Sequence, residues 1–433
     1  IQTDNSEIAN SLNHYFENVG VELSSKLPHP IQDFDSYLGK SMPNSFFWID
    51  IFESEVLQEI GLICSNKKSS LDNISPQVLR AVADVVSKPL AFLYNLSIST
   101  GVFPNTLKVA KVIPIPKKGS LDDPKNYRPI SLLSIFDKIF ERLIFKRLLP
   151  FLDKYSIIYR HQYGFRPNHS TTYALTEITD YIYKSLDDDF YVLGTYLDVC
   201  KAFDSVCHTI LLKKLHHYGI RGQVYNWFTS YLSDRVQYVH VNGVNSSNET
   251  VTCGVPQGST LGPLLFLLYI NDLPNATPNT EIRIFADDAN QFVRHKNLQD
   301  LKTNSELAMK QIILWMTANK LTINYEKTNF AIFSPFVTDT DEKKFNTINI
   351  DGQQVKRVSS VKYLGIYFDD KLSWKDHILH VSTKIKSLSG IFFKYRQFIP
   401  RTCLKNLYFA LVYPIIQYGI EIYGNTKITY LED

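Results

Sequence analysis

Apolar residues recur at helical spacing in the first part of the chain. Ile8, Leu12, Phe16 and Val19 lie three to four residues apart, which is typical of one face of a helix. Residues 1–100 as a whole are predicted to be mainly helical. The prolines between residues 104 and 129 indicate an extended, irregular section with a basic edge.

The middle of the chain alternates strand and helix patterns. Tyr191–Val199 is rich in β-branched and aromatic residues, as expected of a buried strand. The elements predicted after it are two helices (206–215 and 224–232), a hairpin (237–253), a loop (254–258), an apolar helix (261–270), a tight hairpin (282–293), a long helix (301–315) and a strand (330–333). This order predicts the α+β class, with a sheet backed by helices.

Composition and charge add little until their distribution is considered. The 433 residues are 44% hydrophobic, enough for a sizeable core divided into two or three subdomains. The net charge of +3 is only weak evidence for a nucleic-acid partner. Between Asp376 and Glu421, however, there is no acidic residue. The cations in this segment are Lys384, Lys386, Lys394, Arg396, Arg401 and Lys405. They favour a surface that faces phosphates, and a solvated helix face is an equal alternative for the segment taken alone.

Other sequence features restrict the class of protein. The cysteines are scattered, without zinc-ligand spacing, and are predicted to be free thiols in a reducing compartment: Cys64, Cys200, Cys207, Cys253 and Cys403. The longest apolar run, Leu264 to Ile270, is too short to span a bilayer. Since the chain begins at Ile1 and stops at Asp433 without a closing signal, we expect it to be a fragment of a longer protein.

Three acidic residues form the first candidate site. Asp287 and Asp288 are adjacent at the tip of an apolar hairpin, where they repel each other unless a cation compensates. Asp198 lies where the strand Tyr191–Val199 ends. If that strand lies beside the hairpin, Asp198 and Asp287 converge as hard oxygen ligands suited to Mg²⁺. An exposed acidic turn is the better explanation of most isolated Asp pairs, but it does not explain acids embedded in apolar strands.

Three sequence blocks, in this order, resemble the central motifs of reverse transcriptases: Leu197–Asp204, Gly254–Ser259 and Phe285–Asp288. The chain is most similar to non-LTR (LINE-type) retrotransposons of a Jockey-like lineage. Further similar blocks are 111–119, 126–131 and 162–167, which resemble the fingers motifs, and 321–328 and 363–366, which resemble the last palm motifs. Residues 1–100 match only the looser sequence that follows the endonuclease in such elements. Cys200 stands where many relatives have a serine.

The resemblance implies a right-hand polymerase fold of fingers, palm and thumb with a helical N-terminal extension. The implied parts are the extension at 1–100, the fingers at 101–190 with part of 205–255, the palm at 191–370 and a truncated thumb at 371–433. No endonuclease and no Cys/His knuckle are recognised in the sequence.

The resemblance also implies roles for individual residues. Asp198 and Asp287 would be the principal ligands of two Mg²⁺ ions, with Mn²⁺ as a substitute, and Asp288 would complete the cluster. Around the nucleotide, the resemblance implies triphosphate binding for Arg128 and one of Lys117 and Lys118, sugar selection for Phe203, packing against the nucleotide and template for Gln257 and Gly258, and proton donation to pyrophosphate for Lys327. Along the nucleic acid, it implies template guidance for Gln162 and Arg166 and the primer grip for Leu364 and Gly365. Contact with the duplex is implied for Lys384, Lys386, Lys394 and Arg396. Alternatives stay open for several of these residues. Phe203 fits a core aromatic, Lys327 a surface lysine, and Gln162 and Arg166 part of the fingers core. Gln257 and Gly258 fit an ordinary β-to-helix turn, and Lys117, Lys118 and Arg128 fit solvated surface cations.

The implied function is RNA-directed DNA polymerase, with an RNA template, a DNA primer or target and dNTPs as partners. The expected location is the nucleus and cytoplasm, as a ribonucleoprotein and without a membrane; the oligomeric state is left open. Rival readings are a retired copy that serves as an RNA-binding scaffold and a maturase-like enzyme of group II introns. An RNA-templated RNA polymerase is disfavoured by Phe203 and the fingers blocks.

Overall fold

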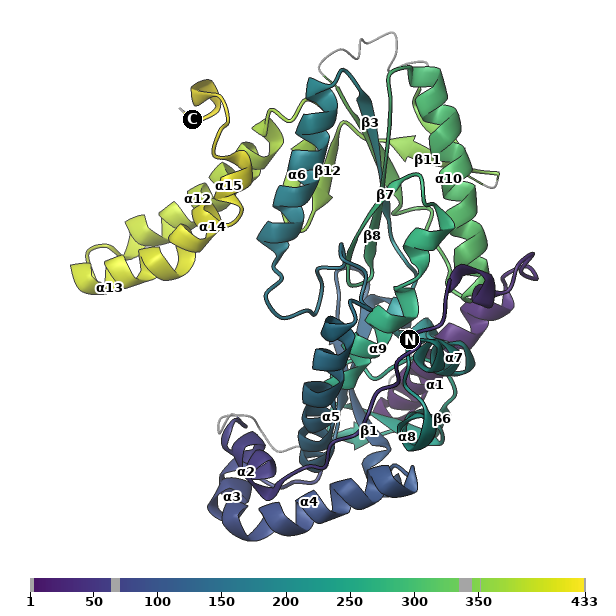
Figure 1. Cartoon of the computed structure of the whole chain (residues 1–433). Helices are drawn as coiled ribbons and strands as arrows, with labels where there is room; N and C mark the ends of the chain where they lie inside the picture. The colour runs from purple at the N-terminus through teal and green to yellow at the C-terminus, as the bar shows by residue number, and fades with distance from the viewer. Residues whose placement is uncertain (1–3, 64–70, 335–344, 351, 432–433) are drawn as a thin grey trace. The chain divides into compact units, whose positions relative to one another are not determined.

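The computed structural model describes residues 4–63, 71–334, 345–350 and 352–431, so Cys64 lies outside the described residues (Figure 1). The chain forms two compact units. Unit 1 comprises Ile1–Arg160, Val199–Ala276 and Ile313–Thr322, and unit 2 comprises His161–Asp198, Thr277–Ile312 and Ile323–Asp433. Helices and sheets occur in both, which confirms the predicted α+β class.

Unit 1 contains a mixed sheet with the order β2-β1-β4-β5, and β6 pairs with β4. Its strands are β1 (Val109–Pro116), β2 (Tyr127–Leu132), β4 (Arg235–Val241), β5 (Val244–Asn245) and β6 (Glu249–Val251). The prediction of an irregular section at residues 104–129 was therefore wrong for β1. Pro114 lies opposite Pro129, and the pairing of β1 with β4 ends before it, at Val112. Pro114 and Pro129 have no backbone N–H to donate, and at these positions few hydrogen bonds of the sheet are lost.

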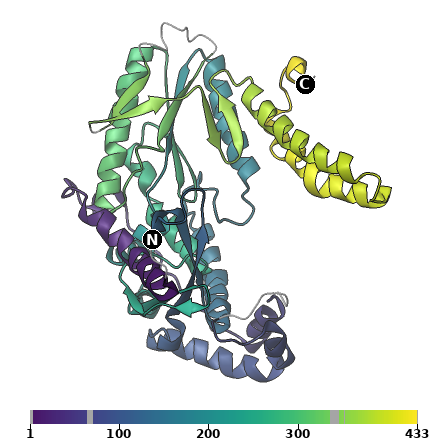
Figure 2. The same cartoon turned by 180° about the vertical axis from the view of Figure 1, so that it is seen from behind.

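Helices make up most of the rest of unit 1. They are α1 (Asn5–Ser25), α2 (Glu53–Gly61), α3 (Pro76–Ala81), α4 (Ala83–Thr100), α5 (Ile135–Lys154), α7 (His208–His217), α8 (Gly222–Leu232), α9 (Leu261–Ile270) and the end of α10 (Leu298–Ala318). Helix α1, purple in Figure 2, packs its apolar face on the sheet, where Leu12 and Phe16 join Val112 and Val239 in one cluster. Every residue of α9 except Pro263 is buried, as expected of a helix that is apolar all round.

Unit 2 is built on a six-stranded sheet with the order β10-β11-β9-β3-β8-β7. Its strands are β3 (Tyr191–Leu197), β7 (Glu281–Phe285), β8 (Asp288–His295), β9 (Asn329–Phe333), β10 (Thr347–Ile350) and β11 (Gln353–Arg357). The predicted buried strand is β3, which pairs antiparallel with β8 on one side and β9 on the other. Helix α6 (Thr171–Asp187) packs on the sheet through Leu175, Ile178 and Ile182.

The C-terminal part of unit 2 is a hairpin followed by helices. The hairpin consists of β12 (Ser360–Tyr363) and β13 (Ile366–Asp369), and the helices are α12 (Lys375–Tyr395), α13 (Arg401–Leu407), α14 (Tyr413–Gln417) and α15 (Ile420–Tyr423), with a π-helical turn at Tyr408–Val412. Across the described residues, no helix is both long enough and apolar enough to pass through a membrane.

A buried ion pair ties α7 to the core of unit 1. Lys214 is fully buried and its ammonium group contacts the carboxylate of Asp272 and the backbone oxygen of Tyr269, the latter at 2.6 Å. Asp272 also accepts a hydrogen bond from the indole Nε1 of Trp315 at 3.1 Å. Burial lowers the pKa of Lys214, while the charge of Asp272 favours the protonated form.

We predict that Lys214→Met lowers the free energy of unfolding by about 3–5 kcal/mol, because it leaves the buried carboxylate of Asp272 without its cation. Urea unfolding monitored by circular dichroism measures the loss. The exposed neighbour Lys213 supplies the control, since Lys213→Met should change stability by only about 0.5 kcal/mol. Equal stability of the two variants would contradict the prediction.

Candidate active site

The sheet of unit 2 brings the three predicted acids to one end. In the β3–β8 register Leu197 is opposite Ala289. Asp198 follows Leu197 and Asp288 precedes Ala289, so the two acids lie at the same end of these antiparallel strands. Asp287 lies in the two-residue turn between β7 and β8, which closes with Phe285 opposite Asp288. The predicted tight hairpin and the placement of Asp198 beside it are therefore both present.

The turn that carries Asp287 is held by Gln162. Its side-chain Oε1 accepts hydrogen bonds from the backbone N–H groups of Ala286 (3.0 Å) and Gly164 (2.9 Å). Ala286 has a φ of 58°, the left-handed conformation that tight hairpin turns require. A Cβ on Gly164 would lie 2.4 Å from the nitrogen of Ala286, so only glycine allows this approach. Gln162 is 2% exposed. Its predicted contact with a template stays a prediction, and its observed contact is with the turn that carries Asp287.

The carboxylates influence one another electrostatically. Partial burial, and then the charges of Asp287 and Asp198, raise the pKa of Asp288 to about 6, although its side chain still reaches solvent. Oδ2 of Asp198 accepts a hydrogen bond from Nδ2 of Asn324 at 3.0 Å and lies 3.6 Å from Nζ of Lys327. Within the described ranges, no three acidic, His or Cys side chains are gathered closely enough to hold one metal ion. In this arrangement Asp198 is turned toward Asn324 and Lys327.

The predicted triphosphate ligands lie on the β1–β2 hairpin of unit 1. Lys117, Lys118 and Arg128 are all exposed. The backbone N–H of Lys117 donates to the oxygen of Asn126 at 2.6 Å, and Arg128 is paired across the hairpin with Ile115. The charge of Lys117, and not that of Lys118, acts on the carboxylate of Asp204.

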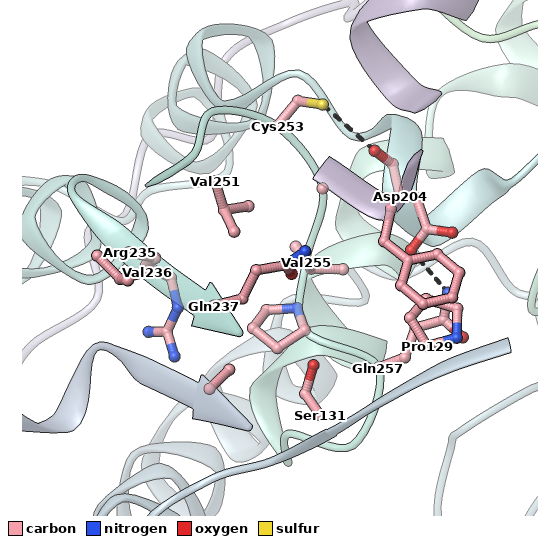
Figure 3. A pocket seen from close by; sticks show the side chains of 14 residues that line it. Pro129, Ser131, Asp204, Arg235, Val236, Gln237, Val251, Cys253, Val255 and Gln257 are labelled. Atoms are coloured by element: carbon pink, nitrogen blue, oxygen red, sulfur yellow. Dashed lines mark hydrogen bonds between the residues drawn. The ribbon is translucent and has the colours of Figure 1, made fainter. Parts of the chain in front are cut away.

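Phe203 and Gln257 also belong to unit 1. The ring of Phe203 is half-buried and stacks on buried Phe266, with centroids 4.6 Å apart. Nε2 of Gln257 donates to Oδ1 of Asp204 at 2.7 Å at one side of a small pocket of about 50 Å³ (Figure 3). Gly258 has a φ of 130°, and a Cβ there would lie 2.5 Å from the oxygen of Ser131.

The predicted nucleic-acid contacts of unit 2 lie on the C-terminal hairpin, on α12 with its C-cap Arg396, and at Arg166 before α6. Leu364 and Gly365 form the β12–β13 turn, and the hydroxyl of Tyr418 donates to the oxygen of Leu364. Lys384, Lys386, Lys394 and Arg396 are exposed. At 3.6 residues per turn, Lys384 and Lys386 point about 200° apart around the helix. A duplex along one side of α12 would therefore meet some of these cations and not all four. Arg166 donates to the oxygen of Gln162 at 3.2 Å.

Comparison with known proteins identifies the family. The family model described as reverse transcriptase (RNA-dependent DNA polymerase) matches residues 115–368, more than half of the chain. The chain belongs to the reverse transcriptase family. The match includes the strand β3, the acidic turn and the loop of Gln257. Asp198, Asp287 and Asp288 are thus acids of a reverse transcriptase domain, and they lie at one end of the β3, β7 and β8 strands of the six-stranded sheet.

The curated relatives are proteins of mobile elements. The chain is 30% identical to the RNA-directed DNA polymerase from mobile element jockey of Drosophila melanogaster, over 86% of this chain and 41% of that protein. It is 28% identical to the probable RNA-directed DNA polymerases from transposon BS (96% and 46%) and transposon X-element (86% and 41%) of the same species. The chain thus spans less than half the length of these relatives. The predicted resemblance to Jockey-like non-LTR elements is confirmed.

Sequence reasoning assigned no role to two residues that contact the predicted site. Asn324 donates to Asp198, and Asp204 accepts from Gln257. Both stand inside blocks that resemble reverse transcriptase motifs, which was the available signal. Their side-chain partners are more than fifty residues away in the sequence, so only the fold shows the contacts.

Asp204 gives a pH-dependent prediction. Burial raises its pKa from 3.8 to about 6, against the hydrogen bond from Gln257 and the charges of Lys201 and Lys117, which lower it. Between these values the folded chain keeps a proton that the unfolded chain has lost, so the free energy of unfolding falls as pH rises from about 4 to about 6. We predict that Asp204→Asn removes this part of the decline, at most about 3 kcal/mol, since one pKa unit corresponds to about 1.4 kcal/mol.

Urea unfolding at several pH values between 4.5 and 7.5 tests this prediction. Asp84 is an exposed acid of α4, and Asp84→Asn should keep the pH dependence of the unaltered chain. Parallel curves for the unaltered chain and Asp204→Asn would show that Asp204 titrates alike in both states.

Proposed function

We propose that this chain carries the polymerase core of a non-LTR retrotransposon reverse transcriptase, which transfers a nucleotide from a dNTP to a primer 3′-hydroxyl on an RNA template. The observation that carries the proposal is the arrangement of Asp198, Asp287 and Asp288 at one end of the β3–β8 pair. The jockey, BS and X-element relatives, which are named as RNA-directed DNA polymerases, support the same activity. No observation favours a retired scaffold or a group II intron enzyme.

The acidic residues suit divalent cations of the Mg²⁺ type, with Mn²⁺ as a substitute. Carboxylate oxygens are the ligands such ions prefer, and burial, followed by the charges of Asp287 and Asp198, raises the pKa of Asp288, a charge interaction that a cation would relieve. Two such ions, if bound, would supply activation of the attacking hydroxyl and charge stabilisation of the leaving pyrophosphate. We assign Asp198 and Asp287 as the principal ligands and Asp288 as the third acid.

The chain's own residues would orient the reactants. Asn324 fixes one oxygen of Asp198 by hydrogen bonding, and Lys327, 70% exposed at its side chain, stands 3.6 Å from the same oxygen. From that position Lys327 can deliver a proton to a leaving phosphate. Arg128 is suited to a two-point contact with phosphate, whereas Lys117 supplies a point charge. We propose Lys117 over Lys118, because only Lys117 acts on Asp204 beside Gln257.

Nucleic-acid contacts complete the proposal. We propose that the β12–β13 turn at Leu364 and Gly365 grips the primer, and that Arg166 and the exposed cations of α12 contact the template or the duplex. The ring of Tyr418 packs so close to Gly365 that a Cβ added there would lie 3.1 Å from it. This packing would keep the turn in one conformation. The domain names fingers, palm and thumb are proposed with the boundaries expected from the sequence.

We predict that Asp198→Asn and Asp287→Asn abolish primer extension and leave the fold intact, because the lost charges bind cations and not the core. Extension of a DNA primer annealed to an RNA template, with dNTPs and Mg²⁺, measures the activity, and circular dichroism checks the fold. Asp180 is an exposed acid of α6 in the same unit, so Asp180→Asn should keep full activity. An unchanged extension rate in either active-site variant would overturn the metal assignment.

We further predict that Phe203→Val raises ribonucleotide incorporation relative to dNTP incorporation tenfold or more. Its stacking on Phe266 fixes the plane of the ring, and an aromatic ring under C2′ leaves no room and no hydrogen-bond partner for a 2′-hydroxyl. Tenfold corresponds to about 1.4 kcal/mol of lost discrimination. The measurement is the ratio of kcat/KM for the two nucleotides. Equal loss of activity on both would make Phe203 a core residue, the alternative considered from the sequence.

A further inference from the structure

The loop that carries Gln257 has a fixed backbone. The N–H of Gly254 donates to the oxygen of Val206 at 2.8 Å, and that of Val255 donates to the oxygen of Phe203 at 2.9 Å. At the other end, the N–H of Ser131 donates to the oxygen of Gln257 itself at 2.8 Å. The main chain at Gln257 is therefore held on both sides, and what remains to be set is the direction of its side chain.

A single carboxylate sets that direction. Over the part of the chain that the structure describes, the one hydrogen bond of the Gln257 side chain runs from Nε2 to Oδ1 of Asp204, as Figure 3 shows. With its pKa at about 6, Asp204 is mainly charged at neutral pH, and hydrogen bonds to a charged acceptor are stronger than neutral ones. Once Nε2 is held, Oε1 of Gln257 is oriented as well, because the amide is planar.

Close backbone contacts hold Asp204 in turn. A Cβ on Gly254, which has a φ of 85°, would lie 2.9 Å from the oxygen of Asp204. The thiol of Cys253 donates to the same oxygen at 3.3 Å. Phe203, the residue before Asp204, is stacked on Phe266. The carboxylate thus projects from a segment that has little freedom to move.

Helix α1 covers this segment from the other side. A Cβ on Gly20 would lie 2.2 Å from the oxygen of Asp204 and 2.7 Å from Sγ of Cys253. Five residues earlier on α1, the ring of Tyr15 lies under the ammonium group of Lys201, whose Nζ is 5.2 Å from the ring centre. Burial, and then the charges of Asp123 and Asp204, raise the pKa of Tyr15 to about 12. Both contacts place α1, which lies outside the matched residues 115–368, directly on the segment Lys201–Asp204.

We propose that Asp204 is a positioning residue that fixes the Gln257 side chain for the incoming nucleotide, and that helix α1 is a working part of the polymerase because it holds Asp204 in place. This inference rests on the proposed function and extends it to a residue and a helix that the family match leaves without a role. Asp204 acts through Gln257 and touches no reacting atom.

The first test separates the acceptor from the shape of the side chain. Primer extension by the full chain at pH 7.5 gives KM and kcat for dNTP in Asp204→Leu, Asp204→Asn, Gln257→Ala and the double variant Asp204→Leu/Gln257→Ala. Asp204→Leu should raise KM about tenfold with a smaller change in kcat, since the hydrogen bond is lost. Asp204→Asn keeps an acceptor oxygen and should recover most of the affinity. In the Gln257→Ala background, Asp204→Leu should have no further effect.

The controls are chosen so that a folding defect cannot imitate the result. Asp84→Leu removes an exposed acid of the same unit and should leave KM unchanged. Titration with primer–template gives the active fraction, which a purely structural role would lower without raising KM. The inference is overturned if Asp204→Asn is as impaired as Asp204→Leu, or if the losses of Asp204→Leu and Gln257→Ala simply add.

The second test addresses α1. Gly20→Ala and Gly61→Ala both place a methyl group on a helix, but a Cβ on Gly61 meets nothing within 4 Å. Gly61→Ala should be neutral or slightly stabilising, as alanine favours helices over glycine. Gly20→Ala should raise KM for dNTP severalfold, because the backbone at Asp204 must shift. Equal KM values for the two variants would remove α1 from the proposal.

Failure of this inference is distinguishable from failure of the proposed function. If the unaltered chain does not extend primers, the proposed function itself fails. If it does, and Asp198→Asn abolishes extension, an unchanged KM in Gln257→Ala overturns the role of Asp204 and leaves the polymerase assignment standing.

Discussion

Mutual repulsion of three carboxylates is the constraint around which unit 2 is organised. Asp198, Asp287 and Asp288 repel one another, and burial, followed by the charges of Asp287 and Asp198, raises the pKa of Asp288 to about 6. Strand β3 cannot withdraw Asp198, because it is hydrogen-bonded on both sides, to β8 and β9. The opposing turn cannot withdraw Asp287, because Gln162 and Gly164 fix the left-handed residue before it. The sheet thus keeps the acids close together, and either a proton on Asp288 or a bound cation would relieve their repulsion.

Both candidate sites depend on close approach of backbones that are distant in sequence. Gly164 approaches Ala286 in unit 2, and in unit 1 Gly254 and Gly20 approach Asp204 while Gly258 approaches Ser131. In each case a side chain at the glycine would collide with main-chain atoms, which have no alternative rotamer. Substitution there must move backbone, and with it the functional residue one to three positions away. This explains why glycines, which carry no chemistry, stand beside the chemical groups.

The sequence predicted what depends on local pattern and missed what depends on tertiary contact. The strand β3, the β7–β8 hairpin and the ends of α9 follow from periodicity and turn residues, and the three acids follow from the family resemblance. Strand β1 was missed, because its prolines suggest irregular chain until Pro114 is seen opposite Pro129. For Gln162 the sequence left a template contact and a core position open, and its burial and its bonds to the turn could be known only once residues 162 and 286 were adjacent. The sequence suggested that the cations of α12 form one surface, but the geometry of the helix distributes them around its axis.

The short segment 198–204 carries both a proposed metal ligand and residues proposed to hold the nucleotide. Asp198 closes a stretch of unit 2, and Val199 opens the next stretch of unit 1, so only four residues separate the proposed metal ligand from Phe203 and five separate it from Asp204. The chain passes from unit 1 back to unit 2 between Thr322 and Ile323. On either side of this point, the oxygen of Thr322 accepts a hydrogen bond from the N–H of Cys200 within unit 1, and the side chain of Asn324 donates to Asp198 within unit 2. The acid proposed to bind a cation and the residues proposed to hold the nucleotide are therefore neighbours along the chain. The contact of α1 with Asp204 within unit 1 lies only a few residues along the chain from Asp198, so a helix remote in sequence, with no reactive group of its own, packs beside a segment proposed to be functional.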